Sequence, residues 1–112
     1  MNSNKKEEFE EIFNSTPPAE LEVVCKLLAA GRMVKIFDRG GLATSVETLG
    51  TIYSDPTHVA AVKNVYRNIF IVVSEPVMRT GYGESVVYTT NNKGREFLEF
   101  CQNRLVAQPN SP

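Results

Sequence analysis

The sequence predicts one domain of the α+β class, in which helices surround a β-hairpin. The chain has 112 residues, of which 42% are hydrophobic and 22% are charged, and this profile is typical of a globular domain. Several segments place apolar residues at helical spacing. One stretch, "EPVMRTGYGESVVYTTNNKGREFLEF", instead holds two β-rich runs around a glycine-rich turn. Helical segments and a hairpin in one short chain indicate a mixed fold.

Two helices are predicted in the N-terminal third. The segment "NKKEEFEEIFN" has Phe9, Ile12 and Phe13 on one side and is otherwise charged, so we expect residues 1–15 to be partly helical or disordered. The segment "STPPAELEVVCKLLAAGR" is a clearer helix, because two prolines suit its first turn and Gly31 can end it.

The middle of the chain is predicted to hold a short strand and two helices. Residues 33–37, "MVKIF", are the strand, and "DRGG" interrupts it. Residues 44–53 place Val46, Leu49, Ile52 and Tyr53 at helical spacing. A third helix over 56–70 follows at once, because Asp55 can cap it and a proline occupies its first position.

The C-terminal part is predicted to be a hairpin followed by a helix. "IFIVVSEPVM" reads as a strand that Pro76 directs to a sheet edge, and "ESVVYTT" is its partner. Asn91 or Asn92 then caps a helix that reaches residue 106. We therefore expect a folded domain over residues 16–106 and a disordered tail over 107–112.

The order of these elements is that of a winged helix-turn-helix domain: a three-helix core, a β-hairpin wing and a C-terminal helix, here with an extra N-terminal helical segment. The stretch "VVYTTNNKGREFLEF" resembles the end of many archaeal winged-helix proteins, with Asn91 where a threonine cap is usual. The resemblance covers residues 17–106. The chain also resembles small winged-helix proteins of spindle-shaped crenarchaeal viruses, the fuselloviruses. These resemblances imply double-stranded DNA binding in transcriptional control, by a viral protein in the host cytoplasm.

Helix 56–70 is the expected recognition helix for the major groove. Its projection places Val59, Val62, Tyr66, Ile69 and Phe70 toward the core. The opposite face is small and polar, and Asn and Arg side chains can read base edges. The residues that we expect at DNA are Thr57, Ala61, Asn64, Arg67 and Asn68, with Lys63 on a phosphate. A plain solvated helix face is the alternative interpretation of the same pattern.

The expected wing tip spans residues 79–84. Arg79, Thr80 and Tyr82 are the candidates there, and an arginine at such a tip can contact phosphate or a minor groove. An ordinary hairpin turn with exposed side chains is the alternative.

The charge distribution leaves a second function open. Residues 1–22 hold two lysines and six glutamates and carry −4, whereas the whole chain carries −1, so the remainder carries +3. A mildly basic body permits an anionic partner. The acidic N-terminal segment instead suits a protein partner, and a winged helix used only for protein interaction is the rival hypothesis.

Other classes of function find little support in the sequence. We expect no enzyme, cofactor or metal site, because no catalytic constellation or metal-ligand spacing occurs. The longest apolar run is too short to span a bilayer and the N-terminus lacks a hydrophobic signal core, so we expect an intracellular protein with no membrane contact. A monomer is expected, because no long amphipathic helix is left outside the core.

The chain has two cysteines, Cys25 and Cys101. Each falls on the apolar stripe of its helix, and these two helices pack together in winged-helix folds. We therefore expect a Cys25–Cys101 disulfide, with two reduced core thiols as the alternative.

Overall fold

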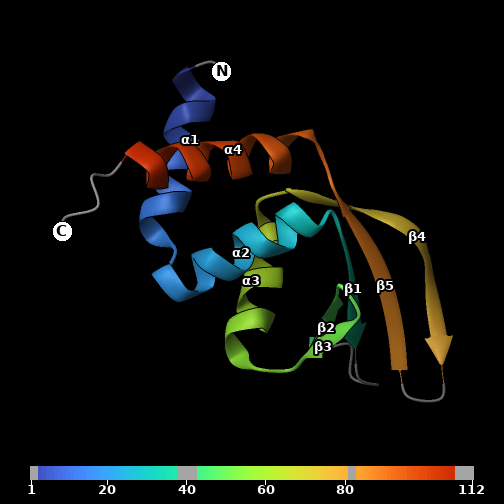
Figure 1. Cartoon of the computed structure of the whole chain (residues 1–112). Coiled ribbons are helices and arrows are strands. Elements are labelled where there is room, and N and C mark those ends of the chain that lie inside the picture. The colour runs from blue at the N-terminus through green and yellow to red at the C-terminus, as the bar shows by residue number, and fades with distance from the viewer. Residues whose placement is uncertain (1–2, 38–42, 81–82, 108–112) are drawn as a thin grey trace.

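The computed structural model describes residues 3–37, 43–80 and 83–107. They form four helices and a five-stranded antiparallel sheet (Figure 1), so the predicted α+β class is confirmed. In chain order the elements are α1 (Ser3–Ser15), α2 (Pro18–Ala30), β1 (Arg32–Phe37), β2 (Ala43–Thr48), β3 (Thr51–Tyr53), α3 (Pro56–Arg67), β4 (Ile71–Thr80), β5 (Gly83–Thr90) and α4 (Asn92–Ala107).

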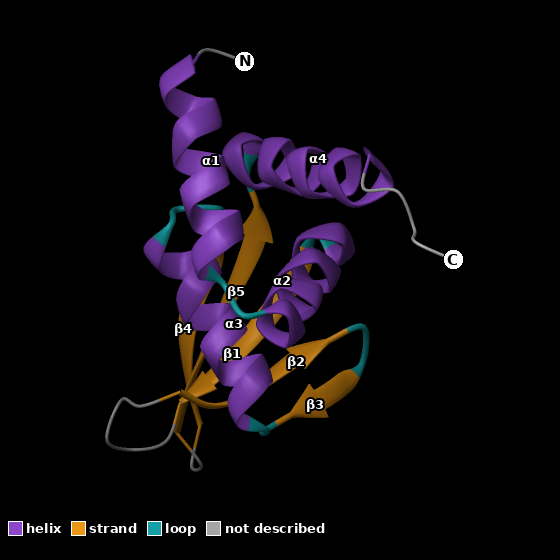
Figure 2. Cartoon of the chain, turned by 90° about the vertical axis from the view of Figure 1, so that its left-hand side faces the viewer, coloured by secondary structure: helices purple, strands orange, loops and turns teal. Residues whose placement is uncertain are grey.

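The sheet has the strand order β3-β2-β1-β5-β4. Its predicted hairpin, β4–β5, is confirmed, and β4 lies at the sheet edge as Pro76 indicates. Helices α2 and α3 cover one face of the sheet, while α1 and α4 lie together at one end of it (Figure 2). Helix α3 packs on this face of the sheet and positions the side chains of the candidate site.

The prediction of a helix over residues 44–53 is wrong, because this segment forms the hairpin β2–β3. Four apolar residues at helical spacing fit a helix, but the segment is also rich in β-branched residues, which favour strands. Pairing with β1 decides the outcome, since Val46 lies opposite Lys35 and is fully buried. Leu49 and Gly50 then turn the chain with positive φ angles of 51° and 78°. Helix α3 is therefore preceded by a hairpin, and the expected helix-turn-helix pair is not formed.

Helix α1 belongs to the packed domain. Phe9 is fully buried, and its ring centroid lies 5.3 Å from that of Phe97 in an edge-to-face arrangement. Phe70 stacks on Phe97 at 4.6 Å, so α1, α4 and the residue just before β4 share one aromatic cluster. Buried aromatic rings of this kind are a large source of hydrophobic stabilisation. A helix of 13 residues is marginal on its own, so packing in this cluster is what stabilises α1.

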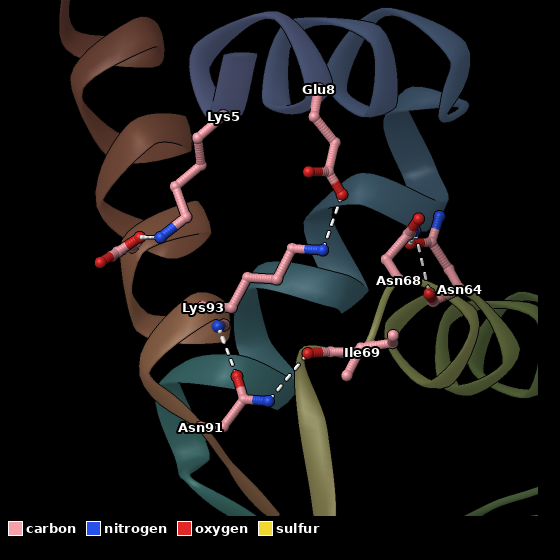
Figure 3. Close-up of polar contacts among 9 residues, drawn as sticks. Lys5, Glu8, Asn64, Asn68, Ile69, Asn91 and Lys93 are labelled. Atoms are coloured by element: carbon pink, nitrogen blue, oxygen red, sulfur yellow. Dashed lines mark hydrogen bonds and ion pairs between the residues drawn. The ribbon is translucent and has the colours of Figure 1, made fainter. Parts of the chain in front are cut away.

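Ion pairs join the charged side of α1 to α4. They are Lys5 to Glu96 at 2.5 Å, Glu8 to Lys93 at 2.6 Å and Glu10 to Arg104 at 3.3 Å. Figure 3 shows Lys5 and Glu8 reaching toward α4. Glu8 and Glu10 of α1 are thus matched by cations of α4, in partly exposed pairs of a kind that adds little to stability.

Helix α3 begins and ends with specific hydrogen bonds. At its start, the Asp55 carboxylate accepts from the His58 backbone N–H at 3.1 Å, which confirms the predicted cap. At its end, Ile69 takes a φ of 59°, its N–H donates to the Tyr66 carbonyl, and the Phe70 N–H donates to the Val65 carbonyl. This is a Schellman motif with a β-branched residue where glycine is usual.

Asn91 connects the end of α3 to the start of α4. Its Nδ2 donates to the Ile69 carbonyl and its Oδ1 accepts from the Gly94 N–H, both at 2.8 Å (Figure 3), which confirms Asn91 as the α4 cap. A side chain at Gly94 would meet the Phe70 carbonyl oxygen at 2.4 Å, so this close approach requires glycine.

Candidate nucleic-acid interface

Helix α3 exposes a different face from the one predicted. Ala61 is fully buried and Asn64 is only 2% exposed, although both were expected at DNA. Asn64 Nδ2 donates to Thr16 Oγ1 at 3.2 Å and to Glu20 Oε2 at 3.0 Å. The prediction that Ala61 and Asn64 contact DNA is therefore wrong. The physical reason is that α2 packs along this face of α3, and the start of α2 supplies polar partners for an asparagine.

The two other polar residues of that face are half-buried. Asn68 Nδ2 donates to the Asn64 backbone carbonyl at 3.0 Å and to Asn64 Oδ1 at 2.9 Å (Figure 3), so its amide is engaged at the helix end. Thr57 lies half-buried in the first turn of α3. Both residues are partly exposed, so their contacts with DNA stay predictions.

Lys63 and Arg67 form the exposed stripe of α3. They lie one turn apart, and both side chains are exposed, as predicted. Tyr66 lies beside them and is 57% exposed, although the helical projection placed it in the core. Ile69 was also expected in the core and is 62% exposed. The helix is thus rotated so that a tyrosine and two cations face outward together.

A lysine from the sheet lies against this stripe. Lys35 of β1 pairs with Val46 and Val86, which points its side chain to the face that α3 covers. Its Nζ lies 5.4 Å from the ring centroid of Tyr66, a cation–π distance. Burial lowers the pKa of Lys35, and the positive charge of Lys63 lowers that pKa further. Sequence reasoning missed Lys35, although a lysine at an inward register of "MVKIF" was a signal.

The tyrosine of α3 rests on the hairpin. The rings of Tyr66 and Tyr88 meet edge-to-face with centroids 6.0 Å apart, and Tyr88 of β5 is 5% exposed. We call this set the α3–hairpin surface; its members are Lys35, Lys63, Tyr66, Arg67 and Tyr88. Two exposed cations, Lys63 and Arg67, lie beside the exposed ring of Tyr66, with Lys35 and Tyr88 buried beneath them. Such a combination can contact phosphates and bases.

The hairpin β4–β5 extends from this surface. Arg79 pairs with Glu84 and Thr80 with Gly83 in the last rungs of the ladder, so both candidate wing residues stand at the end of β4. Tyr82, the third candidate, lies outside the described residues. The expected hairpin is therefore present, with register shifts between Val73 and Glu75 and between Glu75 and Met78.

The predicted disulfide is not formed. Cys25 and Cys101 are free thiols whose side chains lie 4.1 Å apart. Helices α2 and α4 do pack together, as expected, and Cys101 is fully buried. The structure thus brings the two cysteines to neighbouring positions in the reduced state.

Comparisons with known proteins add no family. No family model, no curated protein and no solved structure matches the chain. Among residues 3–37, 43–80 and 83–107, no group of three or more His, Cys, Asp or Glu side chains is placed to hold a metal ion. Within the same ranges, no helix has the length and apolar character that crossing a membrane requires.

Proposed function

We propose that this chain binds double-stranded DNA through the α3–hairpin surface and acts in transcriptional control. The observation that carries the proposal is the exposed stripe of α3, where Lys63 and Arg67 flank Tyr66 and Lys35 lies beneath. The order α2, β1, α3, β4–β5 and α4 supports the proposed relation to the winged-helix fold, with the hairpin β2–β3 in the place of the expected second helix. This relation to the winged-helix fold is part of the proposal.

Phosphate binding is favoured by the electrostatics of this surface. Lys35 is desolvated and also feels the charge of Lys63. An anion bound at the exposed Lys63 would counter the repulsion between the two ammonium groups. Each lysine or arginine that neutralises a phosphate also releases a condensed counterion, so affinity should fall steeply with salt.

Fewer residues would contact base edges in this proposal than the sequence predicted. Arg67 is exposed and can present its guanidinium bidentately to guanine. Tyr66 offers an exposed ring edge beside it. Arg79, near the end of the hairpin, is assigned to phosphate or to a minor groove. Asn64 takes no part in the revised interface.

The test is selection of duplexes from a random pool, followed by fluorescence anisotropy against the selected and a scrambled duplex. Arg67→Ala should cost about 1–3 kcal/mol on the selected duplex and relax preference at one base position. Lys63→Ala should weaken binding to both duplexes alike and lower the salt slope by about one unit.

The matched control is Lys26→Ala, because Lys26 is an exposed lysine on α2 with 71% side-chain exposure. It should bind both duplexes like the parent protein. Equal losses in Lys26→Ala and Lys63→Ala would indicate nonspecific attraction and not a defined face. No loss in Lys63→Ala and Arg67→Ala together would refute the proposal.

A second candidate function is protein binding at the same place. Tyr66, Ile69 and Val73 are 57%, 62% and 55% exposed, and all three are apolar or aromatic. Exposed apolar side chains of this kind are typical of protein interfaces. If the random pool yields no preferred duplex and binding shows no salt dependence, this function takes the place of DNA binding.

A further inference from the structure

Two thiols from helices far apart in the chain meet inside the domain. Cys25 belongs to α2 and Cys101 to α4, and their side chains lie 4.1 Å apart. A disulfide requires a sulfur–sulfur distance of about 2 Å, so closure needs a movement of roughly 2 Å between two side chains that already touch. Such a movement is within the reach of rotamer changes and small helix shifts.

The two thiols differ in their access to solvent. Cys25 is half-buried and lines a groove of about 480 Å³ between α2 and α4. Leu21, Leu98 and Leu105 form much of the wall of this groove, and Lys26 stands at it as well. Cys101 is fully buried and is not part of the groove lining. A small reagent that enters the groove therefore reaches Cys25 first.

The two thiols also differ in pKa, and the more accessible thiol has the lower pKa. The neighbouring thiol of Cys101 lowers the pKa of Cys25, and burial opposes this effect. The neighbouring thiol of Cys25 and burial both raise the pKa of Cys101. Cys25 is therefore both the more accessible thiol and the one that is more easily deprotonated. Since the thiolate is the nucleophile, Cys25 is the thiol expected to react first.

We propose that Cys25 and Cys101 form a reversible oxidation site, in which Cys25 reacts with a small hydroperoxide and Cys101 then closes a disulfide with it. The proposal rests on the position of the pair at the α2–α4 groove and is independent of DNA binding.

The chemistry has two balanced steps. The Cys25 thiolate attacks one oxygen of hydrogen peroxide, an S–O bond forms and the O–O bond breaks. Sulfur loses two electrons, and the released hydroxide takes a proton from solvent, which leaves Cys25 as sulfenic acid. The Cys101 sulfur then attacks the Cys25 sulfur. The S–S bond forms, the S–O bond breaks, and the hydroxyl leaves with the Cys101 proton as water.

The experiment treats the full chain with hydrogen peroxide at neutral pH and follows it by intact mass. The parent protein should lose two hydrogens without gaining oxygen, and dithiothreitol should restore its mass. Cys101→Ser should stop at the sulfenic acid, which dimedone traps on Cys25. Cys25→Ser should react at least about tenfold more slowly than Cys101→Ser, because its remaining thiol is buried.

Two controls keep the outcome decisive. Circular dichroism checks that each variant is folded, and Cys101→Ala replaces Cys101→Ser where the hydroxyl disturbs the core. Dimedone trapping on the parent protein as strong as on Cys101→Ser would show that Cys101 does not resolve the sulfenic acid. Equal rates for the two single variants would show that Cys25 is not the first site. Either result would overturn the proposal.

Discussion

Replacing Asn64 by alanine should unfold the domain more easily without removing any DNA contact. The Asn64 side chain is 2% exposed and makes three hydrogen bonds with other side chains. It donates to Thr16 Oγ1 at 3.2 Å and to Glu20 Oε2 at 3.0 Å, and it accepts from Asn68 Nδ2 at 2.9 Å. The bonds to Thr16 and Glu20 connect α3 to the turn before α2 and to α2 itself, so the substitution affects the contact between these two helices.

The expected cost follows from these bonds. A neutral hydrogen bond contributes about 1 kcal/mol and one to a charged group about 1.5–3 kcal/mol. Partial compensation reduces their sum, because Thr16 Oγ1 still donates to the Ile12 carbonyl at 2.7 Å and Asn68 still donates to the Asn64 backbone carbonyl. We expect Asn64→Ala to lower the free energy of unfolding by about 2–4 kcal/mol.

Urea unfolding followed by far-UV circular dichroism measures this change, since the chain has no tryptophan. The thermal midpoint should fall by about 8–17 °C for a domain of this size. Lys63→Ala is the matched control on the same helix, and as an exposed substitution it should change the free energy by less than about 0.5 kcal/mol. A midpoint for Asn64→Ala equal to that of Lys63→Ala would refute the buried network. A loss of DNA affinity at full stability would restore the original role for Asn64.

Three further outcomes are expected. Gly94→Ala should destabilise the domain by more than about 2 kcal/mol in the same urea assay, because the added carbon would lie 2.4 Å from the Phe70 carbonyl oxygen; an unchanged urea midpoint would contradict that close approach. Leu49→Asn should stabilise the domain by about 1 kcal/mol, because asparagine tolerates the φ of 51° at this position better than leucine does. The Leu49 side chain is 84% exposed, so little packing is lost. A destabilised variant would show that the leucine makes contacts of its own. The side-chain hydrogen bond with His58 lowers the pKa of the Asp55 carboxyl below its usual 3.8. Asp55 therefore stabilises the fold above pH 3.8, and this contribution is lost as the pH falls through the lowered pKa. The unfolding free energies of the parent protein and Asp55→Asn should converge in acid titrations at low pH, and a constant difference between them would refute the linkage.

The sequence alone could predict the elements that carry local signals. Asp55 followed by a proline marks the start of α3, and Asn91 marks that of α4, because capping depends on neighbours within one turn. The β4–β5 hairpin was predictable for the same reason, since its two β-rich runs are joined by a glycine-rich turn. The edge position of β4 followed from a proline that cannot donate to a central ladder.

The tertiary structure alone decided which faces are covered. Residues 43–53 fit a helix or a hairpin locally, and pairing with β1 selects the hairpin. Helix α3 has two faces that a projection can rank by polarity, but the packing of α2 buries Asn64 and leaves Tyr66 outside. A buried asparagine is stable only where another segment supplies partners, and Thr16 and Glu20 come from 48 and 44 residues away in the chain. Periodicity reports the contrast between faces, whereas long-range contacts determine which face meets solvent.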